Sequence, residues 1–411
     1  MRILSIDHEG GFGGSSRSLF YLVKELKKRN IDIDIDICLG KDGPIKDKYK
    51  EINVRVFYYK NLPSCSTVFR LSRNIFSLLN FFLNLFKSFY RIIFLIKQIN
   101  KNYDLIHFNH PNLYLFSVVL KIFTNKPFIF HIRTSLENLY EGNATNSFIF
   151  RINNISSKFF AKIQINLISR VSTDLIFISN FEKVSFMNLG GSKKGNIVNN
   201  IVEQKKPYSK YMNLKSENRF KVAVIENFRW SRGTDRIVEI AQELHKLNEK
   251  RVVFIVAGDM SIPKHLDSKL SKYSNLKDYI YSRGLSNYFI FLGHVKNPEE
   301  VIFECDILSS LSRRAGPWGR SVVEAMQLEK PVISVGENKG LVINNNNGIH
   351  INKYKPEDIV STIIYLIDNK KEYENLSRGA KLFITTYFDS EENSNKIFSI
   401  WEKAISINNY R

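Results

Sequence analysis

The first half of the chain alternates short apolar runs with segments of helical spacing. Residues 2–7 form an apolar run that ends at a glycine cluster, which predicts a buried strand. Residues 18–28 carry apolar side chains at helical spacing, and residues 31–38 alternate Ile and Asp, so a helix and a second strand are predicted. Together these segments form a βαβ unit. Further strands are predicted at 104–108, 127–132 and 175–179.

A second series of the same kind follows a polar break. Residues 203–219 have no apolar period, and we interpret them as a linker. Predicted strands then lie at 220–225, 252–257, 289–292, 306–308 and 331–334, with helices at 234–247 and 322–328. The pattern predicts an α/β protein of two Rossmann-like domains with doubly wound parallel sheets, facing a cleft at the carboxyl ends of their strands. We place the domains at 1–202 and 220–388, and a C-terminal helix that crosses back to the first domain at 389–411.

The chain has 411 residues and a formal net charge of +20, from 60 Lys and Arg against 40 Asp and Glu. The excess is uneven, because residues 51–200 hold 18 basic and 6 acidic side chains. Such an excess indicates either an anionic partner or a solvated basic surface. Finger, RNP and helix-turn-helix signatures are missing, so we expect no nucleic acid partner.

Three cysteines, Cys38, Cys65 and Cys305, are scattered without a CxxC pair. Neither a disulfide framework nor a zinc site is expected, and a reducing compartment fits. The first residues lack the long apolar core of a signal peptide.

Residues 70–100 are rich in Phe, Leu and Ile, but Asn80, Asn84, Lys87 and Arg91 interrupt them. No uninterrupted run approaches the ~20 apolar residues of a spanning helix. The bases and aromatics suit a helix that lies on an anionic membrane. The alternative is a core helix with bases on its outer rim, and the basic first half favours the membrane.

A glycine-rich loop, which includes Gly10, Gly11, Gly13 and Gly14, connects the first strand to the first helix. Its backbone can approach a ligand closely, and the helix amides suit a phosphate. A nicotinamide fingerprint would require a third glycine where Ser16 stands. Three aspartates near the spacing of a ribose-binding acid, Asp32, Asp34 and Asp36, are interpreted instead as the solvent face of an edge strand.

Residues 311–334 contain the most informative motif. A loop with Gly316, Pro317 and Gly319 leads into a helix that carries Glu324. A carboxylate beside a glycine-rich helix start can bind a ribose diol while the helix amides face phosphate. The alternative is a surface glutamate on an ordinary helix.

This stretch resembles the donor-site signature of the retaining GT-B glycosyltransferases of family 4 (glycosyl transferases group 1, Glu-x7-Glu type). Pro317-Trp318-Gly319, Glu324-Ala325-Met326 and Pro331-Val332-Ile333 match it. Further similarities follow in family order at Gly13-Gly14, Lys126-Pro127, His131-x-Arg133, Ile178-Ser179, Val198-Asn199-Asn200, 227–233 and 291–295. Four features depart from the family pattern: Gly316 replaces the first Glu, Arg232 replaces a Lys, Ile201 follows Asn200 in place of a Gly, and the usual Gly-Gly-x-x-Glu is reduced to the sequence at 336–340.

The resemblance implies a retaining transfer of sugar from a nucleotide-diphosphate sugar to a lipid-linked or glycan acceptor in surface polysaccharide assembly (O-antigen, capsule or exopolysaccharide). It implies catalytic roles for His131, Arg229, Arg232 and Glu324. It implies donor binding by Gly13, Gly14, Asn227, His294, Val295, Gly316, Pro317, Trp318, Gly319 and Arg320. We assign Arg133, Lys87 and Arg91 to the acceptor or membrane.

We expect no metal and no cofactor apart from the nucleotide sugar as co-substrate. We also expect a cytoplasmic enzyme, peripheral at the inner membrane face. The alternatives are a GT-B nucleotide-sugar epimerase, an NAD-dependent dehydrogenase, and a non-enzymatic protein that binds membrane or nucleic acid.

Overall fold

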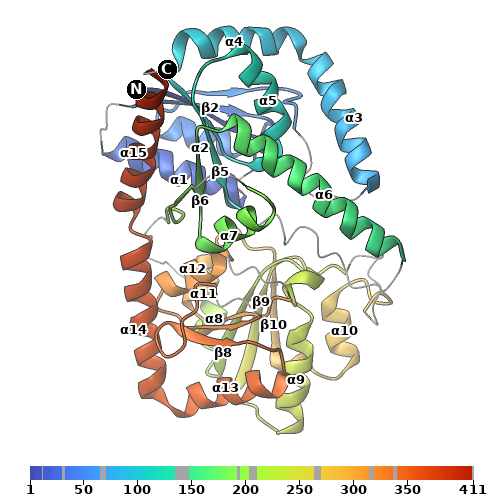
Figure 1. Ribbon diagram of the computed structural model, residues 1–411. Coiled ribbons are helices and arrows are strands. Elements are labelled where there is room, and N and C mark those ends of the chain that lie inside the picture. Colours follow the sequence, from blue (N-terminus) through green and yellow to red (C-terminus); the bar gives the residue numbers. More distant parts are fainter. Residues whose placement is uncertain are drawn as a thin grey trace. The chain divides into compact units, whose positions relative to one another are not determined.

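The computed structural model describes residues 1–11, 13–29, 33–64, 71–134, 148–191, 195–202, 211–262, 270–313, 319–336 and 340–409. The chain divides into two compact units (Figure 1). Unit 1 comprises Met1–Tyr140, Asn146–Glu203 and Phe388–Arg411, and unit 2 comprises Glu141–Thr145 and Gln204–Tyr387.

Unit 1 is built on a parallel sheet with the strand order β3-β2-β1-β4-β5-β6-β7 in the described residues. Its strands are β1 Arg2–Asp7, β2 Asp34–Leu39, β3 Val56–Tyr58, β4 Leu105–Phe108, β5 Phe128–Ile132, β6 Asp174–Phe177 and β7 Asn196–Ile197. Its helices are α1 Gly14–Lys28, α2 Ile45–Glu51, α3 Leu71–Lys87, α4 Phe89–Asn102, η1 Pro111–Leu113, α5 Tyr114–Phe123, α6 Phe148–Val171, α7 Asn180–Asn188 and α15 Ser390–Asn409. Strand order reverses between β1 and β4, where doubly wound sheets bind ligands.

Unit 2 repeats the architecture with the order β10-β9-β8-β11-β12-β13. Its strands are β8 Phe220–Ile225, β9 Val252–Ala257, β10 Phe289–Gly293, β11 Ile307–Ser310, β12 Val332–Val335 and β13 Gly348–Ile351. Its helices are α8 Met212–Lys215, η3 Trp230–Arg232, α9 Arg236–Lys246, α10 Leu276–Ser282, η4 Ser286–Tyr288, α11 Pro298–Phe303, α12 Arg320–Gln327, α13 Pro356–Asp368 and α14 Lys370–Tyr387. The predicted fold class, two Rossmann-like units with parallel sheets, is confirmed.

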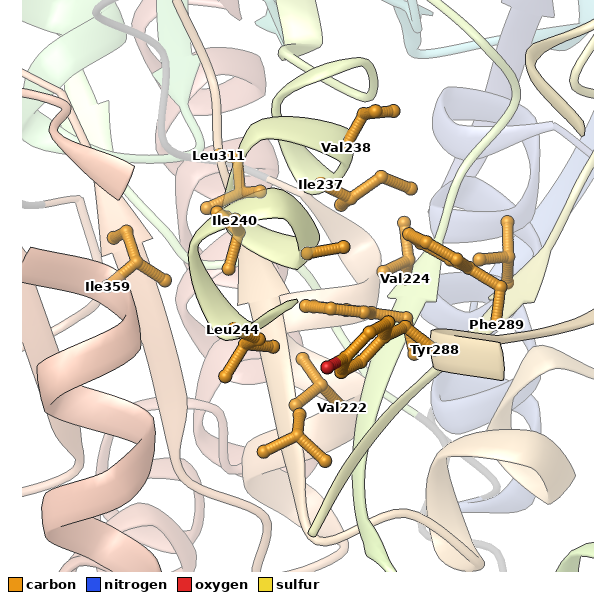
Figure 2. Packing of buried hydrophobic residues seen from close by; sticks show 14 of the residues in the cluster. Val222, Val224, Ile237, Val238, Ile240, Leu244, Tyr288, Phe289, Leu311 and Ile359 are labelled. Atoms are coloured by element: carbon orange, nitrogen blue, oxygen red, sulfur yellow. The ribbon is translucent and has the colours of Figure 1, made fainter. Parts of the chain in front are cut away.

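The core of unit 2 fixes the start of α9 against the sheet. Ile237, Ile240 and Leu244 recur at helical spacing and are fully buried. Figure 2 shows them in one cluster with Val222 and Val224 of β8. Burial of such side chains stabilises the unit by roughly 1.5–3 kcal/mol each. The turn between β8 and α9 is therefore anchored at both ends.

The interpretation of 31–38 as an edge strand is wrong. β3 covers β2, so β2 lies inside the sheet. Asp36 is buried, accepts a hydrogen bond from Tyr103 (2.6 Å) and forms an ion pair with Arg55. Asp34 is exposed as expected, whereas Asp32 lies outside the described residues.

The last helix, α15, packs on unit 1. It contacts α1 and the strands β4, β5 and β6, and it buries Ile397, Trp401 and Ala404 in the core of the unit. Arg29 Nη1 at the end of α1 donates a hydrogen bond to Asn395 Oδ1 (2.6 Å). In the predicted linker, residues 203–210 lie outside the described residues and 212–215 form α8.

Candidate active site

The turn that follows β8 in unit 2 contains the predicted phosphate-binding residues. Asn227 Oδ1 accepts a hydrogen bond from the backbone N–H of Asp259 (2.9 Å). Gly233 ends η3 with φ +72°, and a Cβ there would overlap the Leu311 carbonyl oxygen. Only glycine satisfies both constraints, so the turn has the tight form that the sequence predicts.

Arg313, at the end of the strand that neighbours β8, holds this turn rigid. Its Nη1 and Nη2 each donate to one carboxylate oxygen of Asp235 at 2.6 Å, and Nη1 also donates to the Trp230 carbonyl (2.8 Å). The guanidinium lies 3.6 Å from the centre of the Trp230 ring. Bidentate pairing and cation–π contact are strong and geometrically specific. Arg229 and Arg232 project from this rigid turn and are exposed.

Glu226 lies at the base of the turn and is the closest described carboxylate to Arg232. Its Oε1 accepts a hydrogen bond from Thr234 Oγ1 (3.1 Å), and its Oε2 lies 3.9 Å from Arg232 Nη1. Burial raises the pKa of Glu226 to about 7, opposed by the charge of Arg232. The cation on Arg232 therefore has only a distant, partly neutral counter-charge.

Helix α12 carries the acidic residue of the motif. The Glu324 residue is buried, and its Oε1 lies 3.6 Å from Arg320 Nε one helical turn earlier. Gly319 precedes the helix without a side-chain cap. The alternative of a surface glutamate is wrong, because Glu324 is only 8% exposed.

Two other predicted donor-binding residues, His294 and Val295, follow strand β10. His294 is exposed and Val295 half-buried in the segment after β10. Gly316, Pro317 and Trp318 lie outside the described residues.

In unit 1, polar side chains meet at the carboxyl ends of four strands. Asn109 Nδ2 donates to Asp7 Oδ2 (2.8 Å), and Arg133 Nε donates to Asn109 Oδ1 (2.8 Å). A second nitrogen of Arg133 donates to Asn200 Oδ1. Burial lowers the pKa of Arg133 to about 9, and the Asp7 charge opposes this shift. Arg133 thus remains a cation at neutral pH, inside a network that spans the β1–β4 reversal.

Two histidines lie beside this network. The His8 and His110 rings lie at a tilt of 36° with centroids 4.2 Å apart, and His8 Nδ1 lies 3.4 Å from Asp7 Oδ1. Burial alone would raise the pKa of Asp7, but the hydrogen bond and charge of His8 outweigh it and the pKa is lowered. Burial lowers the pKa of His110 to about 3, so this ring is neutral.

The glycine loop is open. Gly13 and Gly14, at the start of α1, are exposed, and a Cβ at either would meet no atom within 4 Å. No side chain caps the helix at Gly13. The space and the amides that a phosphate would use are both present.

His131 lies inside the sheet. It is 1% exposed and stacks on His107 with centroids 5.5 Å apart. Neither ring nitrogen of His131 has a hydrogen-bond partner among the described residues. Burial, reinforced by Arg133, lowers the pKa of His131 well below its ordinary value. A role for His131 toward sugar or acceptor stays a prediction.

The helices α3 and α4 present a large apolar surface, which we call the α3–α4 surface. Helix α4 buries Ile92, Leu95 and Ile99 against the core. The exposed apolar residues are Phe76, Leu79, Phe82, Leu83, Phe86, Phe89, Tyr90, Ile93 and Phe94. A pocket of about 440 Å³ on α3 is lined by Leu78, Leu79, Phe82, Leu83 and Phe86. Lys87 and Arg91, at the junction of the two helices, are exposed.

Neither helix alone has the length and hydropathy to cross a membrane, and the same holds for every other helix in the described part of the chain. Phe76–Lys87 and Phe89–Asn102 reach that composition only as a pair, and the pair is bent by 75°. The described residues also hold no cluster of three or more His, Cys, Asp or Glu that fits a metal ion.

Several residues of these sites were not predicted, among them Glu226, Arg313 and Asn109. Glu226 follows a predicted strand directly, which is a signal that the sequence offered. Arg313 and Asn109 also follow strand ends, but their partners are distant in sequence. Only the pairing of the strands brings these residues and their partners together.

The class of protein follows from these two sheets and from solved structures with a similar fold. HepE of Anabaena, solved in complex with UDP, superposes with a TM-score of 0.73 at 20% identity, over 98% of this chain and 100% of that one. Another structure of HepE contains UDP-glucose. At this identity the likeness shows the fold, which is GT-B.

The family follows from sequence comparison. Residues 208–383 match the model "Glycosyl transferases group 1", and residues 12–203 match "Glycosyltransferase Family 4". The two matches together cover most of the chain, and both are to glycosyltransferase families. Two uncharacterized glycosyltransferases of Methanocaldococcus jannaschii are similar: MJ1069 is 24% identical over 51% of this chain, and MJ1178 is 32% identical over 34%. The aligned segments span 50% and 36% of those relatives' lengths.

Proposed function

We propose that this protein is a retaining glycosyltransferase that moves a sugar from a nucleotide-diphosphate sugar to a lipid-linked or glycan acceptor in surface polysaccharide assembly. The observation that carries the proposal is the turn after β8. Two exposed arginines, Arg229 and Arg232, project from a backbone that Arg313 holds in place. Preorganised cations of this kind stabilise the charge that develops on a leaving diphosphate.

Each part of unit 2 has a role in this proposal. Arg232 and Arg229 bind the diphosphate and stabilise it as it leaves. Glu324 accepts hydrogen bonds from the nucleotide ribose, as carboxylates in donor sites do. Because arginine charge suffices for the leaving group, we propose that no metal ion takes part. Retention in the family is explained by attack from the leaving-group side with the donor phosphate assisting deprotonation, so the protein supplies no nucleophile.

The acceptor half of the proposal rests on unit 1. Arg133 is a partly buried cation that contacts two asparagine oxygens, and the α3–α4 surface combines apolar side chains with Lys87 and Arg91. A lipid diphosphate acceptor accounts for both features, since its phosphates attract cations and its chain favours apolar surface. We therefore propose a cytoplasmic enzyme that attaches peripherally to the inner membrane face.

A binding assay tests the proposal. The purified protein is titrated with UDP, GDP and ADP by calorimetry, with UDP first because structures of HepE contain it. We expect one nucleoside diphosphate to bind with micromolar affinity and its sugar conjugate to be consumed only when acceptor is added. Conversion of the nucleotide sugar without acceptor would indicate an epimerase. Binding of reduced NAD in place of all three nucleotides would indicate a dehydrogenase.

A further inference from the structure

Glu226 is a partly buried carboxyl group inside the predicted diphosphate-binding turn. It is the residue directly after β8, and its side chain is 18% exposed. One hydrogen bond, from Thr234 Oγ1 at 3.1 Å, holds its Oε1. Its other oxygen faces Arg232 Nη1 at 3.9 Å, which is an ion pair without a close hydrogen bond.

The groups around Glu226 leave it dependent on Arg232. On the turn itself, Arg229 is a second cation, and its charge lowers the pKa of Glu226 less than that of Arg232 does. At the start of α9, Asp235 contributes a negative charge, but Arg313 from the end of β11 pairs with it at 2.6 Å.

Asp259, just after the neighbouring strand β9, contacts the turn through its backbone. Its carboxylate accepts a hydrogen bond from Ser261 Oγ (2.6 Å). No other cation lies within ion-pair distance of Glu226 among the described residues. Arg232 is thus the main group that keeps a charge on Glu226.

We propose that Glu226 binds a proton when a nucleoside diphosphate occupies this turn, so that binding of donor and release of product are coupled to proton uptake and release. The inference rests on the proposed function, because it assumes that Arg232 binds the diphosphate. A bound diphosphate brings two or three negative charges close to Glu226 and engages Arg232. Both changes favour the neutral acid over the carboxylate.

The pKa of Glu226 before ligand binds supports the proposal. Burial already raises the pKa of Glu226 to about 7 in the free protein. Near pH 7.5 the carboxyl group is then mostly ionised before binding, and a small rise in its pKa is enough to protonate it. By linkage, a site that takes up a proton on binding loses affinity as pH rises, up to tenfold per pH unit for one full proton.

Calorimetry of UDP binding at pH 7.5 in phosphate, HEPES and Tris buffers tests the proposal. Proton uptake appears as a binding enthalpy that changes with the ionisation enthalpy of the buffer. We expect an uptake of about half a proton or more in the wild type. Glu226→Gln should remove this uptake while UDP still binds, because Gln keeps the size and the hydrogen bond to Thr234. Glu243→Gln is the matched control: Glu243 is at the far end of α9, bound to Lys246 at 2.8 Å, and its loss should change nothing.

A second measurement does not depend on a variant. The Kd of the wild type for UDP, measured from pH 7 to 9, should rise across this range. Binding with no buffer dependence and no pH dependence overturns the inference and leaves the proposed function intact, as does equal uptake in Glu226→Gln. Failure of UDP, GDP and ADP all to bind overturns both.

Discussion

The indole of Trp401 in α15 lies edge-on against the imidazole of His107 in β4, with the ring centroids 5.4 Å apart. Trp401 is 1% exposed and is among the largest fully buried side chains of the described residues. The last helix of the chain therefore completes the core of unit 1. Its indole covers a strand that carries a neutral, buried histidine.

Replacement of Trp401 by alanine should destabilise unit 1 strongly. A buried Trp-to-Ala change removes apolar contacts and leaves a cavity, at a cost of about 3–5 kcal/mol. Urea unfolding followed by circular dichroism measures the loss. Glu402→Ala, an exposed neighbour in α15, is the control and should change the free energy of unfolding by less than about 0.5 kcal/mol. Equal stability of both variants would mean that α15 is dispensable for unit 1.

The stability of unit 1 should fall in mild acid. Burial lowers the pKa of His107 to about 3, whereas an unfolded histidine titrates near 6.5. Between these values the unfolded chain binds the additional proton, so the free energy of unfolding decreases as pH falls below about 6.5. The slope is about 1.4 kcal/mol per pH unit for each such histidine, and His131 adds in the same direction.

Urea unfolding at pH 7.5, 6.0 and 5.0, followed by Trp401 fluorescence in a Trp230→Phe, Trp318→Phe background, measures this slope, because Trp401 is then the only tryptophan in the sequence. His107→Phe keeps an aromatic ring against Trp401 and should reduce the slope. If the free energy of unfolding of the wild type does not change from pH 7.5 to 5.0, His107 and His131 are not held neutral in the folded protein.

Much of the fold could be predicted because buried parallel strands have continuous apolar runs. The strands at 220–225 and 252–257 were predicted residue for residue, whereas the short strands β3, β7 and β13 were not predicted. The alternation of Ile and Asp in β2 is typical of a half-exposed strand. Asp36 departs from that pattern because Arg55 and Tyr103, both distant in sequence, supply its partners.

The site was predicted less completely for the same physical reason. Local motifs located the tight turn at Gly233 and the acid Glu324, since backbone conformation and helix position are local properties. The network of Asp7, Asn109 and Arg133 depends on which strand ends lie side by side. The pairing of strands decides which ends are neighbours, and a local sequence pattern does not reveal that pairing.

Arg232→Ala should reduce sugar transfer on the order of 10²–10³-fold, because it removes a preorganised cation from the leaving diphosphate. Folding should be unaffected, since the Arg232 side chain is 47% exposed and Arg313 holds the turn. Arg232→Lys retains the charge and should lose less. Turnover of the donor sugar with matched acceptor measures the effect. A folded Arg232→Ala variant with near-normal turnover would end the assignment of this turn.

Glu324→Ala should weaken nucleotide binding about tenfold or more, because a hydrogen bond to a charged group contributes about 1.5–3 kcal/mol. The sharper test compares UDP with 2′-deoxy-UDP and 3′-deoxy-UDP. The wild type should discriminate against at least one of these analogues, and Glu324→Ala should not, which is the logic of a double-mutant cycle. Glu329→Ala, an exposed acid just beyond α12, is the control. Unchanged discrimination in Glu324→Ala would exclude ribose binding by this residue.

The α3–α4 surface should bind anionic membranes. Each base near an anionic surface contributes roughly 1 kcal/mol, and exposed aromatic side chains add burial in the headgroup region. Changing Lys87 and Arg91 together to Glu removes two such contributions and should weaken binding by about 30-fold or more, since 1.4 kcal/mol is a factor of ten. Co-sedimentation with vesicles of phosphatidylglycerol and phosphatidylcholine, at 50 and 500 mM salt, measures the affinity. Because the attraction is screened, the wild type should bind less at high salt.

The control for charge alone is Lys370→Glu with Lys371→Glu, two exposed bases at the start of α14 in unit 2. This variant has the same net charge as the first and should bind like the wild type. Phe86→Ser with Phe94→Ser tests the apolar part, because both side chains are more than 60% exposed and their loss should cost no core packing. If both charge variants lose binding equally, attraction is a property of the net charge and the α3–α4 surface has no special role. If the wild type does not bind the vesicles at low salt, the proposed membrane attachment is wrong and these helices meet a different apolar partner.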